Sequence, residues 1–392
     1  MNTRETAYNF MKKHGHTLDS IDSQRAAAVL KKEIIRGLEG KGPLPMYRTF
    51  LPAYRPASSV PQCITVDVGG TTLRTARATA DENGVMTLSE IRKRPVPGLG
   101  REISESEFFT ELTEFADISD PAIPVAVSWS YNMESLPQYD ARMLGWCKEI
   151  AVTQPSGRTV AQNIRHASHL PELSVSVIND SAAVSMSHAG PPESASGVLG
   201  LILGTGFNIC CPFVLDGAAT LINTECGESH AFAKSSFEKA VIAESSRASA
   251  AHAEKQCSGV YLEKIIRFVL GTMQFEGLIR DAGKYRSCDL ASLSSLRVET
   301  QTDELVSAAL YEAEKRAAGI AAMSAAAFVD IIKDDFEHLT IVTEGSVINK
   351  MPGFYGLFEE ILMGSLSGDT AVTVTAGSES CLIGAAAVCG AY

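Results

Sequence analysis

The sequence has no Cys-x-x-Cys pair, and its nine cysteines are scattered along the chain. An odd and dispersed set of this kind argues against a disulfide framework, so we expect reduced thiols. A metal-binding pattern is also missing. His166 and His169 stand three residues apart, but no cysteine or His-Glu-x-x-His sequence accompanies them. We interpret both as ordinary surface or packing histidines.

Positive charge is scarce too. Lys plus Arg number 34 against 46 Asp plus Glu, which gives a net charge of −12. Without a basic cluster, this balance predicts no nucleic-acid partner. The charge-free stretch 194–215 is interrupted by Gly, Asn and Pro, so we expect two strands around a turn there and no membrane segment. No charged segment followed by an apolar core opens the sequence, and we therefore expect a cytoplasmic location.

Two familiar nucleotide motifs are absent, namely Gly-x-x-x-x-Gly-Lys-Ser/Thr and a complete Gly-x-Gly-x-x-Gly. The segment 65–74 offers another solution. A β-branched strand ends at Val68 and is followed by a glycine pair, two threonines and an arginine: Gly69, Gly70, Thr71, Thr72 and Arg74. The glycines permit positive φ and close backbone approach, and the arginine suits phosphoryl oxygens. The alternative is a plain hairpin turn with an exposed arginine.

The segment 200–210 repeats this plan 135 residues later, with Gly204-Thr205-Gly206 at the turn. Two such turns imply two related halves, each with a loop that faces phosphate. Between them, the apolar run 175–178 ends at Asn179-Asp180, ahead of a helical pattern over 181–189. Polar groups at a strand end commonly face a cleft. Asp180 is therefore a candidate base for phosphoryl transfer to a hydroxyl, or alternatively a carboxylate that stabilises the helix dipole.

The rest of the pattern alternates helices and strands, as in an α/β protein. We expect helices over 23–38, 305–333, 354–363 and 379–389, and strands over 63–80, 124–130, 338–343 and 371–375. A loop rich in proline, through Pro52 and Pro56, separates the first helices from the first strands.

These motifs resemble, in order and almost end to end, those of the hexokinases in the actin-like sugar kinase superfamily. The segment 67–74 is similar to the family's Asp-x-Gly-Gly-Thr-Asn-x-Arg, and Asn179-Asp180-Ser181 to its Asn-Asp-Thr. Further similar segments are 50–54, 130–148, 204–208, 223–227, 254–262 and 343–347. The resemblance implies two actin-like (ribonuclease H-like) α/β domains around a deep cleft. The small domain would comprise 59–179 with the C-terminal helix 376–392, and the large domain 1–58 and 180–375.

The resemblance also implies an ATP-dependent hexokinase acting on the 6-hydroxyl of a hexose, with glucose the expected substrate. Asp180 would be the general base, assisted by Lys148 and Arg74. The sugar would contact Ser130, Lys148, Asn179, Asp180, Asn208, Glu225 and Glu254. ATP would contact Asp67, Gly69, Gly70, Thr71, Thr72, Arg74, Gly204, Thr205, Gly206, Gly345 and Ser346. Asp67 would hold Mg²⁺, through water. Hexose and ATP would be the partners.

Several positions depart from the family pattern. Thr72 replaces an Asn, Cys147 a Thr, Tyr131-Asn132 a Phe-Pro, and Cys226 a Trp, while 378–384 keeps only the last glycine of Gly-Ser-Gly-x-Gly. These changes leave the preferred hexose and the adenine site open. They also leave open a sugar sensor with impaired catalysis. A third alternative is an actin-like ATPase that ignores sugar, but the retained residues on the sugar side argue against it: Ser130, Lys148, Asn179, Asn208, Glu225 and Glu254.

Overall fold

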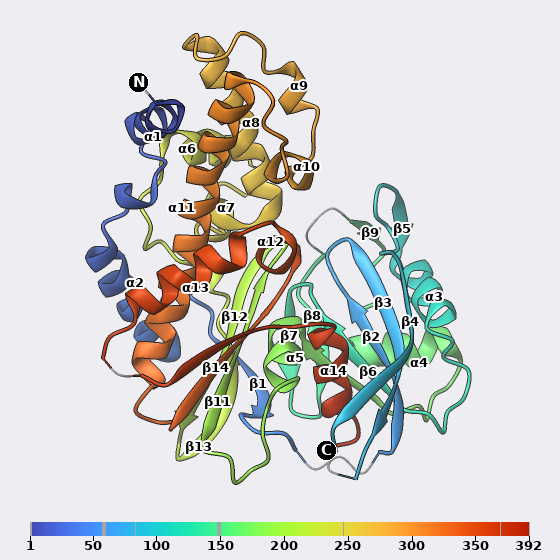
Figure 1. The fold of residues 1–392 in the computed structure, drawn as a ribbon. Coiled ribbons are helices and arrows are strands. Elements are labelled where there is room, and N and C mark those ends of the chain that lie inside the picture. Colours follow the sequence, from blue (N-terminus) through green and yellow to red (C-terminus); the bar gives the residue numbers. More distant parts are fainter. Residues whose placement is uncertain are drawn as a thin grey trace.

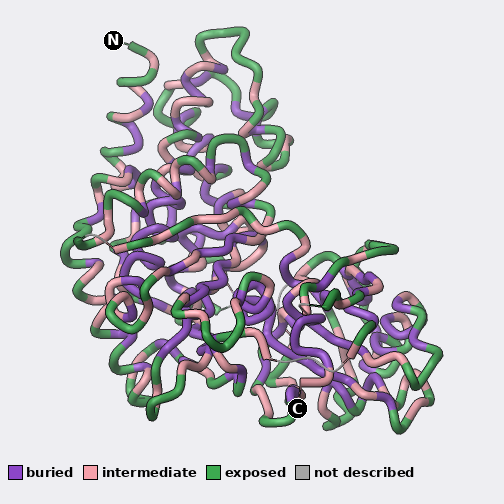
Figure 2. Tube along the Cα trace, turned by 60° about the horizontal axis from the view of Figure 1, so that its bottom comes forward, coloured by how far each residue is buried: buried purple, intermediate pink, exposed green. Residues whose placement is uncertain are grey.

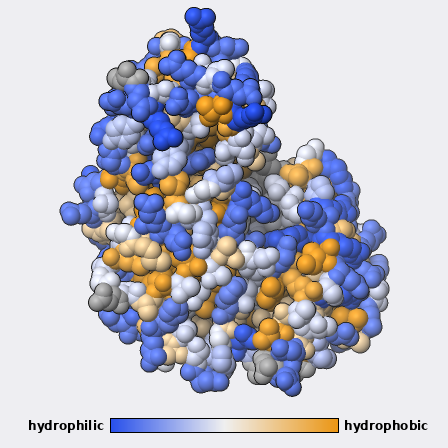
Figure 3. Space-filling view, viewed as in Figure 1, coloured by the Kyte–Doolittle hydropathy of each residue, from blue (hydrophilic) through white to orange (hydrophobic). Residues whose placement is uncertain are grey.

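The computed structural model describes residues 2–56, 60–82, 84–146, 150–245, 247–368 and 370–391. Two β-sheets, each flanked by helices, form two α/β domains that lie side by side (Figure 1). On the face shown in Figure 3, the surface is notched between the helical part at the top and the domain at the right.

The five-stranded sheet has the order β10-β6-β2-β3-β4. Its strands are β2 (Gln62–Val68), β3 (Thr72–Ala80), β4 (Met86–Pro95), β6 (Val125–Trp129) and β10 (Val175–Asn179). The first three form an antiparallel meander, and β6 and β10 add in parallel. β6 and β10 are buried along their whole length, as expected of parallel strands covered on both faces. The helix α3 (Glu105–Phe115) precedes β6 in the chain, and α4 (Val160–Ser168) precedes β10.

The six-stranded sheet repeats this plan in the order β1-β13-β12-β11-β14-β15. Its strands are β1 (Tyr47–Pro52), β11 (Ser196–Leu203), β12 (Phe207–Leu215), β13 (Ala218–Asn223), β14 (His338–Glu344) and β15 (Val372–Ala376). Again three strands, β11, β12 and β13, form an antiparallel meander, and β14 and β15 add in parallel beside β11. β1 pairs with β13 at the other edge. The expectation of two related halves is confirmed. The expected loop through Pro52 is wrong in its first part, because the chain there pairs with β13 as β1.

Smaller strands complete the five-stranded domain. The pair β5 (Glu102–Ser104) and β9 (Ala151–Thr153) is parallel, and β7 (Met133–Leu136) with β8 (Asp140–Met143) is an antiparallel hairpin.

Most other helices surround the six-stranded sheet and rise above it (Figure 1). They are α1 (Thr3–Lys13), η1 (Leu18–Ser20), α2 (Ser23–Leu38), η2 (Cys226–Glu228), α6 (Ser236–Ala243), α7 (Glu254–Cys257), α8 (Gly259–Phe275), α9 (Gly283–Arg286), α10 (Leu290–Ser294), α11 (Gln301–Ile332), α12 (Ser346–Lys350) and α13 (Phe354–Ser365). From Ala317 to Val329 every residue of α11 is buried, so its alanine-rich stretch belongs to the core. Figure 2 shows buried residues in the interior and exposed residues along the outside of the chain. Among the described helices, none is long and apolar enough to cross a bilayer.

Two helices are exchanged between the sheets. α5 (Asp180–Met186) follows β10 but packs on β11, and α14 (Ser380–Ala387) follows β15 but packs on β2 and β6. Figure 1 shows both helices between the two sheets. They touch closely, because a Cβ on Gly384 would lie 1.7 Å from the carbonyl oxygen of Ala183. The crossing therefore requires glycine at position 384.

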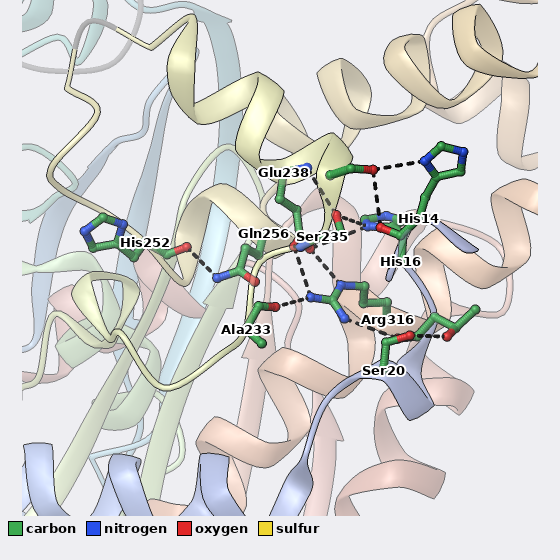
Figure 4. Close-up of polar contacts among 11 residues, drawn as sticks. His14, His16, Ser20, Ala233, Ser235, Glu238, His252, Gln256 and Arg316 are labelled. Atoms are coloured by element: carbon green, nitrogen blue, oxygen red, sulfur yellow. Dashed lines mark hydrogen bonds and ion pairs between the residues drawn. The ribbon is translucent and has the colours of Figure 1, made fainter. Parts of the chain in front are cut away.

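A buried ion pair ties the N-terminal segment to the helical core (Figure 4). Arg316 of α11 donates to both carboxylate oxygens of Glu238, at 2.7 and 3.0 Å, and to the carbonyl oxygen of Thr17. His16 lies beside this pair and contacts Ser235 Oγ at 2.8 Å. Burial lowers the pKa of His16 to about 4, so the imidazole is neutral at pH 7.

Candidate functional site

The first glycine turn closes the hairpin between β2 and β3. Strand register places Arg74 opposite Asp67 on β3 and Ser128 opposite it on β6. Arg74 therefore donates to Asp67 Oδ2 through Nε and Nη2, both at 2.9 Å, while Ser128 donates to Oδ1 at 2.9 Å. Asp67 is buried and Arg74 partly buried, so the arginine is not the exposed residue of a plain hairpin.

Neither Gly69 nor Gly70 adopts the positive φ that a glycine pair permits. Gly69 is needed for close approach instead, because a Cβ there would lie 2.9 Å from the carbonyl oxygen of Thr72. The Gly69 N–H donates to that same oxygen at 3.0 Å. Thr71 and Thr72 are exposed at the tip of the turn. In this conformation, donors for a phosphate would have to come from the tip and not from the Gly69 N–H.

The second glycine turn joins β11 to β12. The Gly204 N–H donates to the carbonyl oxygen of Gly206 at 3.0 Å, and the Gly204 carbonyl accepts from Gly259 N at 2.7 Å. A Cβ on Gly204 would lie 3.3 Å from the nitrogen of Ser346 and 3.5 Å from Cα of Gly345. The structure thus brings Gly204 together with Gly345 and Ser346, which were also predicted to contact ATP, at one end of the six-stranded sheet.

Asn179 and Asp180 stand where β10 ends and α5 begins. Asn179 is the N-cap of the helix, since its Oδ1 accepts from Ser181 N at 3.0 Å and from Ser181 Oγ at 2.6 Å. Asp180 is the first helical residue, and its Oδ1 accepts from Ser181 N at 2.8 Å. Only 9% of Asp180 is exposed. The carboxylate therefore sits at the positive end of a helix, between the two sheets.

A series of side-chain hydrogen bonds runs from this turn to the predicted sugar-side residues. Asn208 Nδ2 donates to Ser181 Oγ at 3.2 Å and to Asn223 Oδ1 at 2.7 Å. Asn223 Nδ2 in turn donates to Glu225 Oε1 at 2.9 Å. Glu225 has a left-handed φ of 52°, which is uncommon for a residue with a side chain. The structure thus brings together Asn179, Asn208 and Glu225, which the sequence predicted separately.

Glu254 reaches the same region from the second glycine turn. Its Oε2 accepts from Phe207 N at 3.0 Å, and a Cβ on Gly206 would lie 2.7 Å from this oxygen. A Cβ on Gly227, which follows Cys226 in η2, would lie 3.1 Å from Cβ of Glu254. Glycine at 206 and 227 therefore makes room for the Glu254 side chain. Cys226 is fully buried, and burial raises the pKa of its thiol.

Ser130 follows β6, and its N–H donates to the carbonyl oxygen of Val68, which ends β2. It thus lies beside the first glycine turn. The next residue, Tyr131, donates from its hydroxyl to the carbonyl oxygen of Gly69 at 3.1 Å. Trp129, Tyr131 and Trp146 form an aromatic cluster here, with the two indoles 5.8 Å apart. Lys148, predicted to contact the sugar, and Cys147 lie outside the described residues.

Sequence reasoning missed four residues of this region: Ser128, Asn223, Glu344 and Glu379. Asn223 had a signal, because it begins the segment 223–227 that resembles the family. Glu344 ends β14, and its Oε1 lies 3.8 Å from Arg74 Nη1. Burial raises the pKa of this carboxyl, and the charges of Asp67 and Glu379 add to the rise against the lowering effect of Arg74.

The residues present fit a magnesium ion held through water. One oxygen of Asp67 is engaged by Arg74 and the other by Ser128, yet each carboxylate oxygen can accept more than one hydrogen bond. Mg²⁺ keeps several of its waters when it binds to proteins, so a carboxylate that bonds such water suits it. Within the described residues, no group of three metal-ligating side chains forms a closed cage.

Two surface cavities, of about 610 and 410 Å³, lie along α4 and away from these residues. Arg158, Arg165, His166 and His169 line the larger one, so both histidines are surface residues, as expected.

Comparison with known proteins supports the same reading of the chain. One hexokinase family model matches residues 13–190, and a second matches 198–310 and 281–391. Human Hexokinase-3 is 27% identical over 268 residues, which is 62% of this chain and 28% of that protein. Human Hexokinase-1 is 23% identical over 387 residues, which is 85% of this chain and 42% of that protein. The chain thus spans less than half of either relative.

Solved structures show the fold. A hexokinase from Schistosoma mansoni complexed with glucose superposes with a TM-score of 0.81 and 18% identity, covering 99% of this chain and 98% of that one. A glucokinase from Balamuthia mandrillaris in complex with glucose gives a TM-score of 0.56 at 15% identity, covering 94% and 99%. The two-domain architecture is therefore that of the actin-like sugar kinases. Since the family models together match most of its length, the chain belongs to the hexokinase family.

Proposed function

We propose that this protein is an ATP-dependent hexokinase that phosphorylates the 6-hydroxyl of a hexose, with glucose as the preferred substrate. The observation that supports it best is the hydrogen-bond series from the start of α5 through Asn208 and Asn223 to Glu225. Such a series fixes several hydroxyl-binding groups beside one carboxylate. The glucose named in both structural relatives favours the same sugar.

In the proposed reaction Asp180 takes the proton of the 6-hydroxyl while that oxygen attacks the γ-phosphorus of ATP. The bond from the γ-phosphorus to the bridging oxygen breaks, and ADP leaves. Asn208, Glu225 and Glu254 would orient the ring, together with Ser130, Asn179 and Lys148. Arg74 and the tips of the two glycine turns would neutralise the phosphates. Magnesium, when bound to the phosphates, would supply further positive charge, and Asp67 would hold it through water. Closure of the domains on the sugar would exclude water as a competing acceptor.

The test is sugar-dependent formation of ADP by the wild type and by Asp180→Asn. Loss of a general base lowers turnover by about 10²–10⁴-fold, so we expect that loss with glucose binding retained. Binding can be followed by tryptophan fluorescence, because Trp129 and Trp146 flank the Ser130 segment. Asp334→Asn, on the exposed surface, is the control. Turnover in Asp180→Asn above one tenth of wild type would refute the base.

The preferred hexose is tested in the same assay with glucose, mannose, fructose and glucosamine. We expect the highest kcat/KM with glucose. A clear preference for another hexose would correct the substrate and leave the reaction class intact.

A second candidate is a sugar sensor with impaired catalysis. One observation favours it: Arg74, the guanidinium proposed to meet the phosphates, is surrounded by the carboxylates of Asp67, Glu344 and Glu379. Tight glucose binding without ADP formation, in the wild type and at saturating MgATP, would select the sensor.

A further inference from the structure

Glu379, like Glu225, has a left-handed backbone conformation. It precedes α14 with φ 55° and ψ 27°, in the left-handed region that costs a side-chain-bearing residue free energy. Its carboxylate does not cap the helix, since no side-chain cap bond forms there. The Ser380 N–H donates instead to Glu344 Oε2, at 3.2 Å. The unfavourable backbone conformation of Glu379 is therefore not explained by helix capping.

The carboxylate of Glu379 reaches across to Arg74. Its Oε2 accepts from Arg74 Nη1 at 2.7 Å, while Asp67 holds Nε and Nη2 on the other edge of the guanidinium. Both edges of the cation are thus occupied by carboxylates, and Glu344 lies 3.8 Å from Nη1. Arg74 is thus shared among three acidic side chains, and an incoming polyphosphate would have to compete with them for its N–H donors.

The two carboxylates on Arg74 differ in burial. Asp67 is almost fully buried and also bonded by Ser128, whereas the Glu379 side chain is 32% exposed. Because an exposed ion pair contributes less than a buried one, Glu379 is the partner of Arg74 that a ligand can displace more easily.

We propose that Glu379 is an internal competitor for the phosphoryl donor: it holds the outer edge of Arg74 until the terminal phosphate of the nucleotide replaces it. This inference rests on the proposed function, which puts the γ-phosphate of ATP at Arg74. Glu379 then weakens binding of the triphosphate, and it does so only through its contact with Arg74.

The experiment measures binding of MgATP and of MgADP by calorimetry, in the presence of glucose, to the wild type and to Glu379→Gln and Glu379→Gly. Both variants should bind MgATP about tenfold more tightly, which is ~1.4 kcal/mol. MgADP, which lacks the terminal phosphate, should change less than twofold. Glu379→Gly also suits the left-handed backbone, so its urea midpoint should exceed that of Glu379→Gln. Glu360→Gln, an exposed residue of α13, is the control and should leave both affinities unchanged.

If Glu379 and Arg74 form only a structural ion pair, Glu379→Gln should be less stable than the wild type and should bind MgATP equally or more weakly. That result would overturn the inference, as would an equal gain for MgADP. The proposed function fails separately: tighter MgATP binding without hexose-dependent ADP formation would support the competitor and refute the kinase. Absence of nucleotide binding in all proteins, Glu379→Gly included, would refute both.

Discussion

At the scale of single residues, Arg316 and Glu238 form a buried ion pair outside the candidate site. Both side chains are almost fully buried, and the pair is completed by bonds from Arg316 to the carbonyl oxygens of Thr17 and Ala233. A charge left alone in such a place is far more costly than the pair is favourable. Removal of either side chain would therefore destabilise the fold, because the other charge would stay buried without its partner.

Arg316→Met should lower the free energy of unfolding by about 3–5 kcal/mol, because Glu238 is left buried without its counter-charge. Urea denaturation measures the change. The double variant Arg316→Met with Glu238→Gln should recover part of the loss, since the uncompensated charge is gone. Arg297→Gln is the matched control, because its pair with Glu299 is exposed and should matter by less than about 0.5 kcal/mol. Equal effects of the two arginine substitutions would contradict this account.

Two buried groups give pH dependences of opposite sign. Burial lowers the pKa of His16 from 6.5 to about 4. Between these values the unfolded chain binds a proton that the native state refuses, so acidification destabilises the fold by up to about 3 kcal/mol. Burial raises the pKa of Glu314 from 4.5 to about 7. The native state then keeps a proton that the unfolded chain releases, so raising the pH over that range destabilises the fold.

The two effects partly cancel in the wild type, and single variants should separate them. Relative to wild type, His16→Gln should gain stability as the pH falls from 6.5 to 4, and Glu314→Gln as it rises from 4.5 to 7. Urea unfolding at a series of pH values gives both differences. Parallel curves for wild type and His16→Gln would show that His16 is not neutral in the native state.

At the scale of elements, the contact of α5 with α14 depends on Gly384. Gly384→Ala should lower stability by about 1–3 kcal/mol or more, because the new methyl overlaps the carbonyl of Ala183. Gly271→Ala, in α8 with no atom within 4 Å of the added Cβ, should raise stability by about 0.5–1 kcal/mol. Urea unfolding compares the two. A stabilising Gly384→Ala would mean that the helices are not in close contact.

The elements were largely predictable from the sequence, and their partners were not. Apolar runs with clear ends, such as 23–38 and 338–343, gave helices and strands close to the observed bounds. β1 was missed because Pro52 suggested a loop, although proline is tolerated at the end of an edge strand. Motif order grouped Asn179, Asn208 and Glu225, and the structure links them by hydrogen bonds, while their contact with a sugar stays a prediction. Glu344 and Glu379 were missed because they reach Arg74 only through long-range packing of β14 and α14.

At the scale of the whole molecule, the exchange of α5 and α14 joins the two domains into one cooperative unit. Thr65 of β2 donates to the carbonyl oxygen of Leu382 at 2.8 Å, and Gly200 of β11 lies against Ser181. Loss of either sheet would therefore expose a helix that the other sheet supplied. The boundaries 59–179 with 376–392, and 1–58 with 180–375, stay a prediction, and residues 57–59 lie outside the described chain.

We expect a single unfolding transition in urea. Tryptophan fluorescence reports on the five-stranded domain, because Trp129 and Trp146 both lie there. Far-UV circular dichroism is dominated by helices, most of which surround the other sheet. Midpoints that coincide within error would confirm the coupling, whereas two separate midpoints would contradict it.

The same exchange has a consequence during synthesis. The ribosome completes β10 about 200 residues before it begins α14, and the apolar face of β2 and β6 waits uncovered through that interval. The five strands of this sheet are thus complete at Asn179, but the sheet stays exposed to aggregation until α14 is synthesised. A nascent chain halted between these points should bind chaperones. A chain halted after α14 has emerged should not.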